Sequence, residues 1–275
     1  MRTKKAPRPE RTVPAADDVT RRVNAERLAL LGWGRAILLQ LAHPLVAAGV
    51  YEHSAFRATT RIAAQRLHAT IRAMLSLTFG TDAEREAVLH AIRTIHQRVH
   101  GHLPMTVGPF PEGTRYSAED PSLVLWVHVT LLESVPMVYE RFVRPLSVQE
   151  RDTYCEQAAW VAEALGAAPS EVPRSWDAMQ TQVQCALGSG AITVGPQACE
   201  LARAVLWPGL GRLVPPAGWL NRLVTIGLLP PAIREQYGFD WTPAQQRLLD
   251  RATPVIRAAR RRLPAPIVLW GASRG

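Results

Sequence analysis

Cysteine and lysine are both scarce in this chain of 275 residues. The three cysteines, Cys155, Cys185 and Cys199, are odd in number and lack Cys-x-x-Cys spacing, so neither a disulfide framework nor a thiolate metal site is expected. Such cysteine usage suits a reducing compartment, and we expect the protein to be cytoplasmic. Lysine occurs only at Lys4 and Lys5, so arginine supplies nearly all of the positive charge.

Several motifs with well-understood chemistry are also missing. The sequence has no Gly-x-Ser-x-Gly elbow, no phosphate-binding glycine loop, no His-Glu-x-x-His and no dinucleotide-binding glycine pattern. These absences argue against a hydrolase, a nucleotide-binding protein and a zinc peptidase. Glu-x-x-His pairs on two helices, which a ferritin-like di-metal site requires, are absent as well.

Apolar runs of membrane-spanning length are lacking. The basic leader is not followed by an apolar core with a cleavage pattern, so no secretory signal is expected. The most apolar early stretch, residues 36–50, is broken by Gln40, His43 and Pro44 and is too short to span a bilayer. We therefore expect no transmembrane segment, and peripheral contact with a membrane surface stays open.

The formal net charge of +9 gathers partly near the two ends of the chain. Five basic residues lie in the aperiodic leader, residues 1–16, and four arginines lie between residues 257 and 262. We expect a disordered basic arm and a solvated helix face, respectively. No helix-turn-helix, zinc-finger or aromatic-basic signature accompanies the charge, so nucleic acid is not an expected partner.

Stretches rich in Ala, Leu and Arg with helical periodicity dominate residues 17–275. The 18 glycines and 22 prolines stand mainly between these stretches, which indicates helices joined by short loops. We see no convincing strand pairs and no linker. The sequence therefore predicts a single all-α domain of about ten helices, several of them long and packed around a pocket.

Capping signals locate several helix ends. Asp17 and Asp18 are placed to cap a first helix, Thr81 and Glu84 have capping-box spacing, and Thr242 precedes a proline at a helix start. A Gly-Trp-Gly segment at residues 32–34 is expected to interrupt the first helical run. The expected helices span residues 19–31, 35–42, 44–49, 59–79, 81–101, 118–142, 148–165, 175–187, 197–206, 216–226, 231–237 and 242–262.

All eight histidines lie between residues 43 and 128, less than a third of the chain. This clustering directs the search for a metal or haem site to that region. The histidines are His43, His53, His68, His90, His96, His100, His102 and His128.

Helical geometry distinguishes the histidines of the helix expected at residues 81–101. At about 100° per residue, its apolar stripe consists of Val88, Ile92, Ile95 and Val99. His96 borders this stripe, whereas His90 points toward solvent. His96 and His100 are four residues apart, a spacing that can place two imidazoles on one metal. The structural alternative is a half-buried His96 that bonds a backbone carbonyl.

The preceding helix offers a basic group for an anion. Arg66 and Thr70 lie four residues apart on one face, and His68 projects to a different side. An arginine pairs with carboxylates through two parallel hydrogen bonds, so its partner is either an acidic side chain or a bound carboxylate such as a haem propionate.

The remaining histidines receive structural interpretations. His128 sits in an apolar stripe with Val124 and Leu131, and we expect a core histidine whose ring is hydrogen-bonded. His43 and His53 lie near helix ends, where they cap a helix or line the mouth of a pocket.

These residues fall within a pattern that resembles a known family. The chain resembles the shared domain of the latex-clearing-protein rubber oxygenases and the MpaB-type oxygenases, with matches from about Arg27 to Pro264. The matching runs are Arg35-Ala-Ile-Leu-Leu-Gln-Leu-Ala-His-Pro44, Ala47-Ala-Gly-Val-Tyr-Glu-His-Ser54, Arg66-Leu-His-Ala-Thr70, Phe79-Gly80, His96-Gln-Arg-Val-His-Gly101, Tyr116-Ser-Ala-Glu-Asp-Pro121, Trp126-Val-His128, Leu229-Pro-Pro-Ala-Ile-Arg234 and Tyr237-Gly238.

The resemblance implies a helical fold around a haem b whose iron has a histidine ligand. That histidine maps to His96, with His100 as the alternative ligand, and the Arg-x-x-x-Thr motif maps to Arg66 and Thr70. Rubber-cleaving members have a lysine beside the threonine that can cap the distal face of the haem. Ala69 stands there in this sequence, so the resemblance does not extend to rubber cleavage.

We therefore predict a haem b-dependent oxygenase that acts with dioxygen on an apolar, unsaturated small molecule. His96 binds iron, Arg66 holds a propionate or orients the distal pocket, and Thr70 bonds near the haem edge. Glu52 is the carboxylate expected to remove a proton next to the alkene. One alternative hypothesis is a helical protein that binds haem or another ligand for storage or sensing, without turnover. A second is a helical protein that binds no metal and acts through protein partners.

Overall fold

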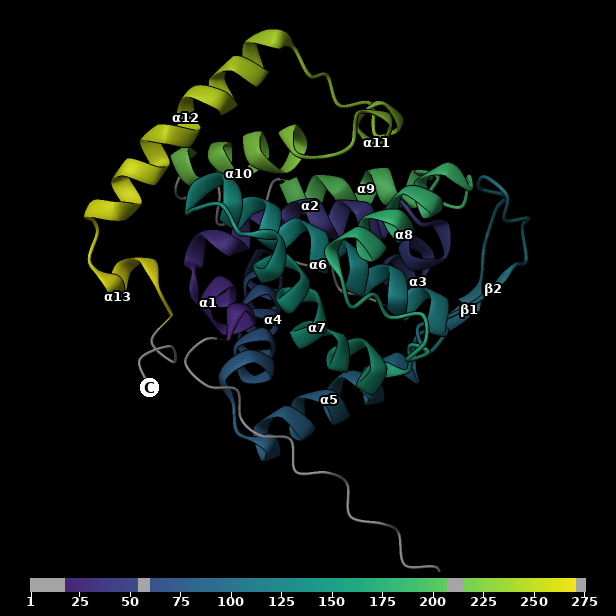
Figure 1. Cartoon of the computed structure of the whole chain (residues 1–275). Helices are drawn as coiled ribbons and strands as arrows, with labels where there is room; N and C mark the ends of the chain where they lie inside the picture. The colour runs from purple at the N-terminus through teal and green to yellow at the C-terminus, as the bar shows by residue number, and fades with distance from the viewer. Residues whose placement is uncertain (1–17, 54–59, 207–214, 271–275) are drawn as a thin grey trace, which may run out of the picture.

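Helices make up most of the part of the chain that the computed structural model describes, residues 18–53, 60–206 and 215–270. Side chains are described for these residues except at 60–67 and 215–217. Figure 1 shows the helices gathered around α6, with a small hairpin at one side. The prediction of an all-α domain is confirmed. The expected basic arm, residues 1–16, lies outside the described residues.

Thirteen α-helices, one 3-10 helix and two short strands form within the described ranges. The elements are α1 (Val19–Ala25), η1 (Arg27–Ala29), α2 (Leu30–Leu41), α3 (Pro44–His53), α4 (Thr60–Phe79), α5 (Asp82–His96), β1 (His100–His102), β2 (Arg115–Ser117), α6 (Pro121–Phe142), α7 (Val148–Leu165), α8 (Trp176–Gly188), α9 (Pro196–Leu206), α10 (Pro215–Gly227), α11 (Pro231–Gln236), α12 (Pro243–Arg262) and α13 (Ala265–Val268).

Side-chain caps begin the helices where the sequence places them. Asp18 accepts hydrogen bonds from the first backbone N–H groups of α1. Complete capping boxes open α5, where Thr81 pairs with Glu84, and α12, where Thr242 pairs with Gln245. These caps satisfy N–H groups that a helix start leaves without partners, which is why the starts were predictable.

Helix α6 forms the centre of the fold. Asp120 caps it, and its buried side chains face α2, α7 and α8. By length and composition α6 qualifies as a candidate membrane span, as do residues 27–41 and 44–53 taken together as one pair bent by 105°. Because 67% of the apolar window of α6 is buried inside the protein, this helix has the burial of a core helix.

The Gly-Trp-Gly segment does not interrupt a helix, contrary to expectation. Both glycines lie within α2, and the chain breaks earlier, at the extended residue Glu26. A Cβ atom on Gly32 would lie 2.6 Å from the Ser134 carbonyl oxygen of α6, and one on Gly34 would lie 2.2 Å from Thr225 Oγ1 of α10. The two glycines therefore allow α2 to pack closely against α6 and α10. The stability gained from this packing outweighs the low helix propensity of glycine.

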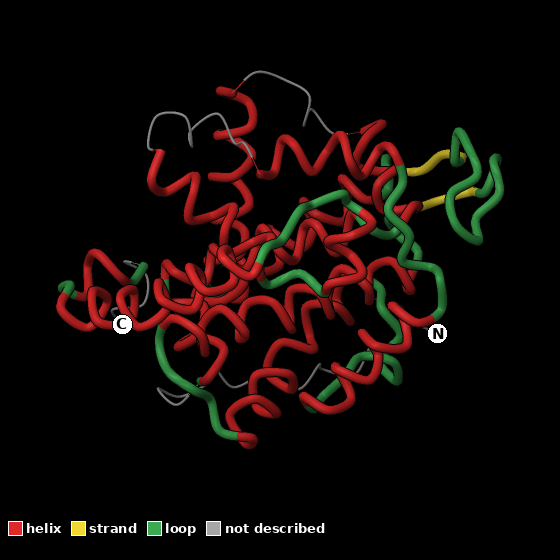
Figure 2. The backbone as a smooth tube through the Cα atoms, turned by 90° about the horizontal axis from the view of Figure 1, so that it is seen from above, coloured by secondary structure: helices red, strands yellow, loops and turns green. Residues whose placement is uncertain are grey.

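A two-stranded hairpin replaces the end of the helix expected at residues 81–101. Strands β1 and β2 pair antiparallel, with Gly101 opposite Tyr116. Figure 2 shows the strands and their connecting loop standing away from the helical body. A Cβ atom on Gly101 would lie 2.6 Å from the Tyr116 hydroxyl oxygen, so the strand passes beneath this ring only because residue 101 is glycine. The expectation that no strands form was wrong here.

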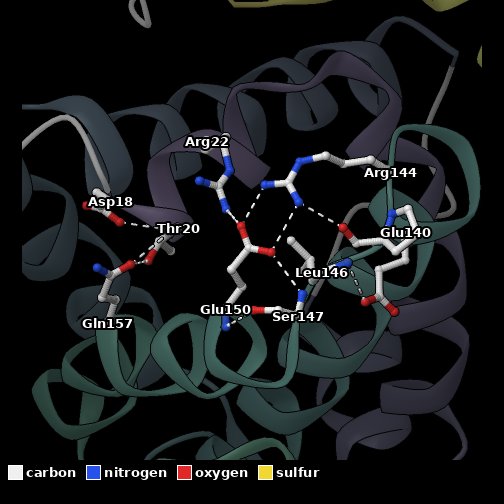
Figure 3. A network of polar contacts seen from close by, with 10 residues as sticks. Asp18, Thr20, Arg22, Glu140, Arg144, Leu146, Ser147, Glu150 and Gln157 are labelled. Atoms are coloured by element: carbon white, nitrogen blue, oxygen red, sulfur yellow. Dashed lines mark hydrogen bonds and ion pairs between the residues drawn. The ribbon is translucent and has the colours of Figure 1, made fainter.

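A polar network joins α1 to the corner between α6 and α7 (Figure 3). The Glu150 carboxylate accepts two hydrogen bonds from Arg144, at 2.6 and 3.1 Å, and also pairs with Arg22 of α1. It accepts a further bond from the Ser147 backbone N–H at 2.8 Å, which completes the capping box of α7. This corner fixes the start of α7, whose far end forms part of the candidate site.

Candidate functional site

An apolar cavity of about 310 Å³ lies between α3, the end of α5, α6 and α7. Figure 1 shows α5 crossing the lower end of α7, and the two helices are in contact. Most of the lining is aliphatic, and the polar side chains in the wall are Gln40, His53, His96, Tyr116, Ser117 and His128. A cavity of this volume and character is at the lower end of the range of small-molecule sites, roughly 300 to 1,000 Å³.

His96 stands at the wall of this cavity, as the last residue of α5. Its side chain is half-buried, and burial lowers its pKa below 6.5, opposed in part by the negative charge of Glu119. The hydrogen bonds of the described residues include none to its imidazole ring. His96 is therefore neutral at pH 7 and has a nitrogen lone pair available to a metal or hydrogen-bond donor. The alternative of a ring bonded to a backbone carbonyl is not what the structure shows.

The predicted helical pair of His96 and His100 does not form. Helix α5 ends at His96, and the chain turns through Gln97 into β1. His100 is exposed on that strand and does not line the cavity. The two imidazoles therefore do not share one helix face. This geometry does not support His100 as the alternative iron ligand, and that role stays a prediction.

The apolar stripe of α5 differs from the expected one. Leu89, which the pattern did not include, is the buried residue of the helix, whereas Ile95 is 60% exposed. Ile95 also lines the cavity beside His96. A large apolar side chain with this exposure at a cavity wall indicates that the cavity is open to solvent along the end of α5.

His53 and Tyr116 line the α3 side of the cavity, and Glu52 precedes His53 in α3. The Nε2 atom of His53 lies 3.1 Å from the His100 carbonyl oxygen and 3.4 Å from the Tyr116 hydroxyl oxygen. The pKa of Tyr116 is raised first by burial and second by the charge of Glu52. Glu52 itself is exposed at the end of α3 and is not part of the cavity wall. Its role as a base stays a prediction.

His128 is not the hydrogen-bonded core histidine that its apolar neighbours predicted. Its ring is half-buried at the cavity wall, and its Nε2 atom is buried without a hydrogen-bond partner. Burial lowers its pKa from 6.5 to about 4. The prediction of a hydrogen-bonded ring came from the apolar stripe of α6. Such a stripe shows that a side chain faces the interior of the protein. It does not show whether the side chain contacts a hydrogen-bond partner or a cavity.

Arg66 and Thr70 both belong to α4, which packs against α1 and α5. The Arg66 side chain lies outside the described residues. Thr70 is exposed and does not line the cavity. The shared face expected for the two side chains and their contact with a bound group therefore stay predictions.

The donor set suits haem better than a bare metal ion. Among the residues that the structure describes, no group of three His, Cys, Asp or Glu side chains is placed to hold a metal ion. A haem iron already has four porphyrin nitrogens and takes only one or two axial ligands from a protein. The neutral imidazole of His96 in an apolar cavity fits that requirement.

Comparisons with known proteins identify the family of the chain. Residues 20–258 match the family described as "ER-bound oxygenase mpaB/B'/Rubber oxygenase, catalytic domain", and the chain belongs to this family. It is 26% identical over 244 residues to the uncharacterized proteins Mb2261 of Mycobacterium bovis and Rv2237 of Mycobacterium tuberculosis, with 86% of each chain covered. No solved structure matches the chain. The predicted family is thereby confirmed, and the protein is an oxygenase-family member with an all-α fold.

Proposed function

We propose that the protein is a haem b-dependent oxygenase that uses dioxygen to oxidise an apolar, unsaturated small molecule. The observation that carries this proposal is His96, a neutral, half-buried imidazole without a hydrogen-bond partner among the described residues, at the wall of an apolar cavity. Membership in an oxygenase family supplies the reaction class. Haem, when bound, supplies the chemistry of dioxygen activation.

Each residue of the chain has a defined task in this proposal. His96 donates its lone pair to the iron, and Arg66 pairs with a propionate. Thr70 donates a hydrogen bond near the haem edge. Glu52 accepts a proton from the carbon next to the alkene, for which the Glu52 side chain turns from its exposed position toward the cavity mouth.

The lining of the cavity favours an apolar substrate. Leu45, Val50, Val127 and Leu131 contribute aliphatic surface from α3 and α6. Such a wall excludes water and binds hydrocarbon through the hydrophobic effect. A short polyprenyl or terpenoid compound is preferred to a polymer, because Ala69 departs from the lysine of rubber-cleaving members.

We further propose a cytoplasmic location with access to membrane-dissolved substrates. The three cysteines are free, which suits a reducing compartment. Leu248 and Val255 are exposed large apolar residues on α12, and Arg247 and Arg251 are exposed beside them. Apolar and basic side chains on one helix face suit peripheral contact with an anionic lipid surface. Cell fractionation with and without a high-salt wash tests both statements.

The decisive experiment combines absorption spectroscopy with oxygen uptake. Protein expressed with adequate haem supply should be red and show a Soret band, and a colourless protein that also fails to take up added haemin contradicts the cofactor. The haem-loaded protein is then incubated separately with latex and with short polyprenyl and terpenoid alkenes, while oxygen uptake and carbonyl products are followed.

We expect products from the small alkenes and little from latex. Robust aldehyde or ketone formation from latex would overturn the substrate class. No product from any alkene, with haem fully bound, would identify a haem-binding or sensing protein instead.

A further inference from the structure

The Tyr116 hydroxyl is held in a fixed position at the cavity wall. A Cβ atom on Gly101 of β1 would lie 2.6 Å from the hydroxyl oxygen, and the ring also lies close to Gly49 of α3. His53 meets the ring edge to face, with 6.3 Å between the ring centroids. Gly49, His53 and Tyr116 all line the cavity. The hydroxyl end of the ring, where His53 contacts it, therefore lies at the cavity.

The proton on His53 determines what this hydroxyl can bind. The Nε2 atom of His53 lies 3.1 Å from the His100 carbonyl oxygen. A carbonyl oxygen only accepts, so Nε2 carries a proton, both in the neutral ring and in the imidazolium. The Tyr116 hydroxyl, 3.4 Å from the same Nε2 atom, therefore accepts from this N–H group and does not donate to it. Its own O–H group stays a donor, and the hydrogen bonds of the described residues include no acceptor for it.

The other features of the wall favour a neutral ligand. The Gln40 amide already donates to Thr130 Oγ1 at 3.0 Å, and Ser117 Oγ accepts from the Glu119 backbone N–H at 3.2 Å. No Asp, Glu, Lys or Arg side chain is among the described residues that line the cavity, so a charged ligand would have no counter-charge there. Burial raises the pKa of Tyr116, so its phenol stays protonated at pH 7 and keeps its donor.

We propose that Tyr116 selects the substrate by donating a hydrogen bond to an oxygen atom of it. The substrate class is then a neutral, apolar, unsaturated compound that has one carbonyl, hydroxyl or ether oxygen, in place of a pure hydrocarbon. An occupant without this oxygen leaves the O–H group of Tyr116 without an acceptor, which costs binding free energy. The inference rests on the proposed function for the reaction, whereas binding to the cavity itself does not require haem.

The test compares carvone with limonene, which have the same unsaturated carbon skeleton and differ by one carbonyl oxygen. Binding to the purified full-length protein is measured by titration calorimetry, before and after loading with haemin. Tyr116→Phe keeps the ring and removes only the hydroxyl. We expect this change to weaken carvone binding about tenfold and to leave limonene binding unchanged, because only carvone loses a hydrogen bond.

The carbonyl stretch of bound carvone gives a readout that a purely structural role of Tyr116 would not move. A hydrogen bond weakens the C=O bond, so the infrared band should lie at lower wavenumber in the wild-type protein than in a hydrocarbon solvent. It should return to the solvent value in Tyr116→Phe. Where this variant does not fold by far-UV circular dichroism, fluorotyrosine in place of tyrosine should shift the band further, because a more acidic phenol is a stronger donor. An unshifted band would contradict the hydrogen bond.

Two hydroxyl variants are the matched controls. Tyr51→Phe removes a hydroxyl of α3 that donates to Glu200 at 2.9 Å, and Tyr51 is not among the described residues that line the cavity. Ser117→Ala removes the other hydroxyl of the described cavity wall. Carvone affinity should stay unchanged in both variants. A loss in Ser117→Ala in place of Tyr116→Phe would assign the oxygen to another group and overturn the inference.

The outcomes for the oxygen and for the haem are separate. A protein with a Soret band that binds neither compound, or whose carvone affinity does not change in Tyr116→Phe, would overturn this inference while the proposed function stands. A protein that takes up no haemin but binds carvone through Tyr116 would overturn the haem-dependent function and support the binding inference.

Discussion

Replacement of Arg35 by methionine should be among the most damaging single changes in this protein. Arg35 of α2 is only 2% exposed, and its Nη1 atom lies 2.7 Å from a carboxylate oxygen of Glu133 in α6. The same nitrogen donates to Ser134 Oγ at 2.6 Å, and the Nε–H group donates to the Leu228 carbonyl oxygen at 2.7 Å, just after α10. One guanidinium therefore joins three segments of the core.

The expected magnitude follows from the burial of its partner. Glu133 is 6% exposed, so Arg35→Met leaves a carboxylate buried without its counter-charge. Removal of one partner from a buried ion pair costs about 3–5 kcal/mol. A domain has a total free energy of unfolding of roughly 5–15 kcal/mol, so this loss is a large fraction of it.

Urea unfolding at pH 7, followed by far-UV circular dichroism, measures this loss. The double variant Arg35→Met, Glu133→Leu is the matched control, because it removes both charges and leaves an apolar contact of similar size. We expect it to recover most of the lost free energy. A loss below about 1 kcal/mol for Arg35→Met, or a double variant no more stable than the single one, would refute the reasoning.

Three further predictions concern the cofactor and the α6–α7 corner. His96→Ala should abolish haem retention in a haemin titration, whereas His90→Ala, on the exposed side of α5, should leave the Soret band unchanged. Arg66→Ala should weaken haem affinity by about 1–3 kcal/mol in the same titration, with a smaller effect for Thr70→Val, and unchanged affinity would mean that Arg66 pairs with a protein carboxylate. The Arg144 and Ser147 hydrogen bonds lower the pKa of Glu150 from 4.5 to about 2, so its contribution to stability is present above pH 4.5 and is lost as the pH falls to about 2. Glu150→Gln should therefore destabilise the protein by about 1 kcal/mol at pH 7 in thermal unfolding, and the difference from wild type should vanish near pH 2.

Local chemistry made much of the fold predictable from the sequence. Two helix starts, Thr81 with Glu84 and Thr242 before Pro243, were readable because a helix start is marked by residues within one turn of each other. The order of short motifs along the chain indicated the family. Helical periodicity also placed His96 at the edge between buried and exposed residues of α5, and its side chain is half-buried, although Ile95 of the expected stripe is exposed.

Contacts between segments that are distant in the sequence determined the features that the sequence did not predict. The role of Gly32 and Gly34 in α2 depends on atoms of Ser134 and Thr225, about a hundred and two hundred residues away, so propensity alone predicted a break where packing required a helix. The hairpin that separates His100 from His96 is stabilised by a strand beginning at Arg115. The free state of His128 depends on which neighbours already have partners, a property of the assembled cavity that no single helix pattern contains.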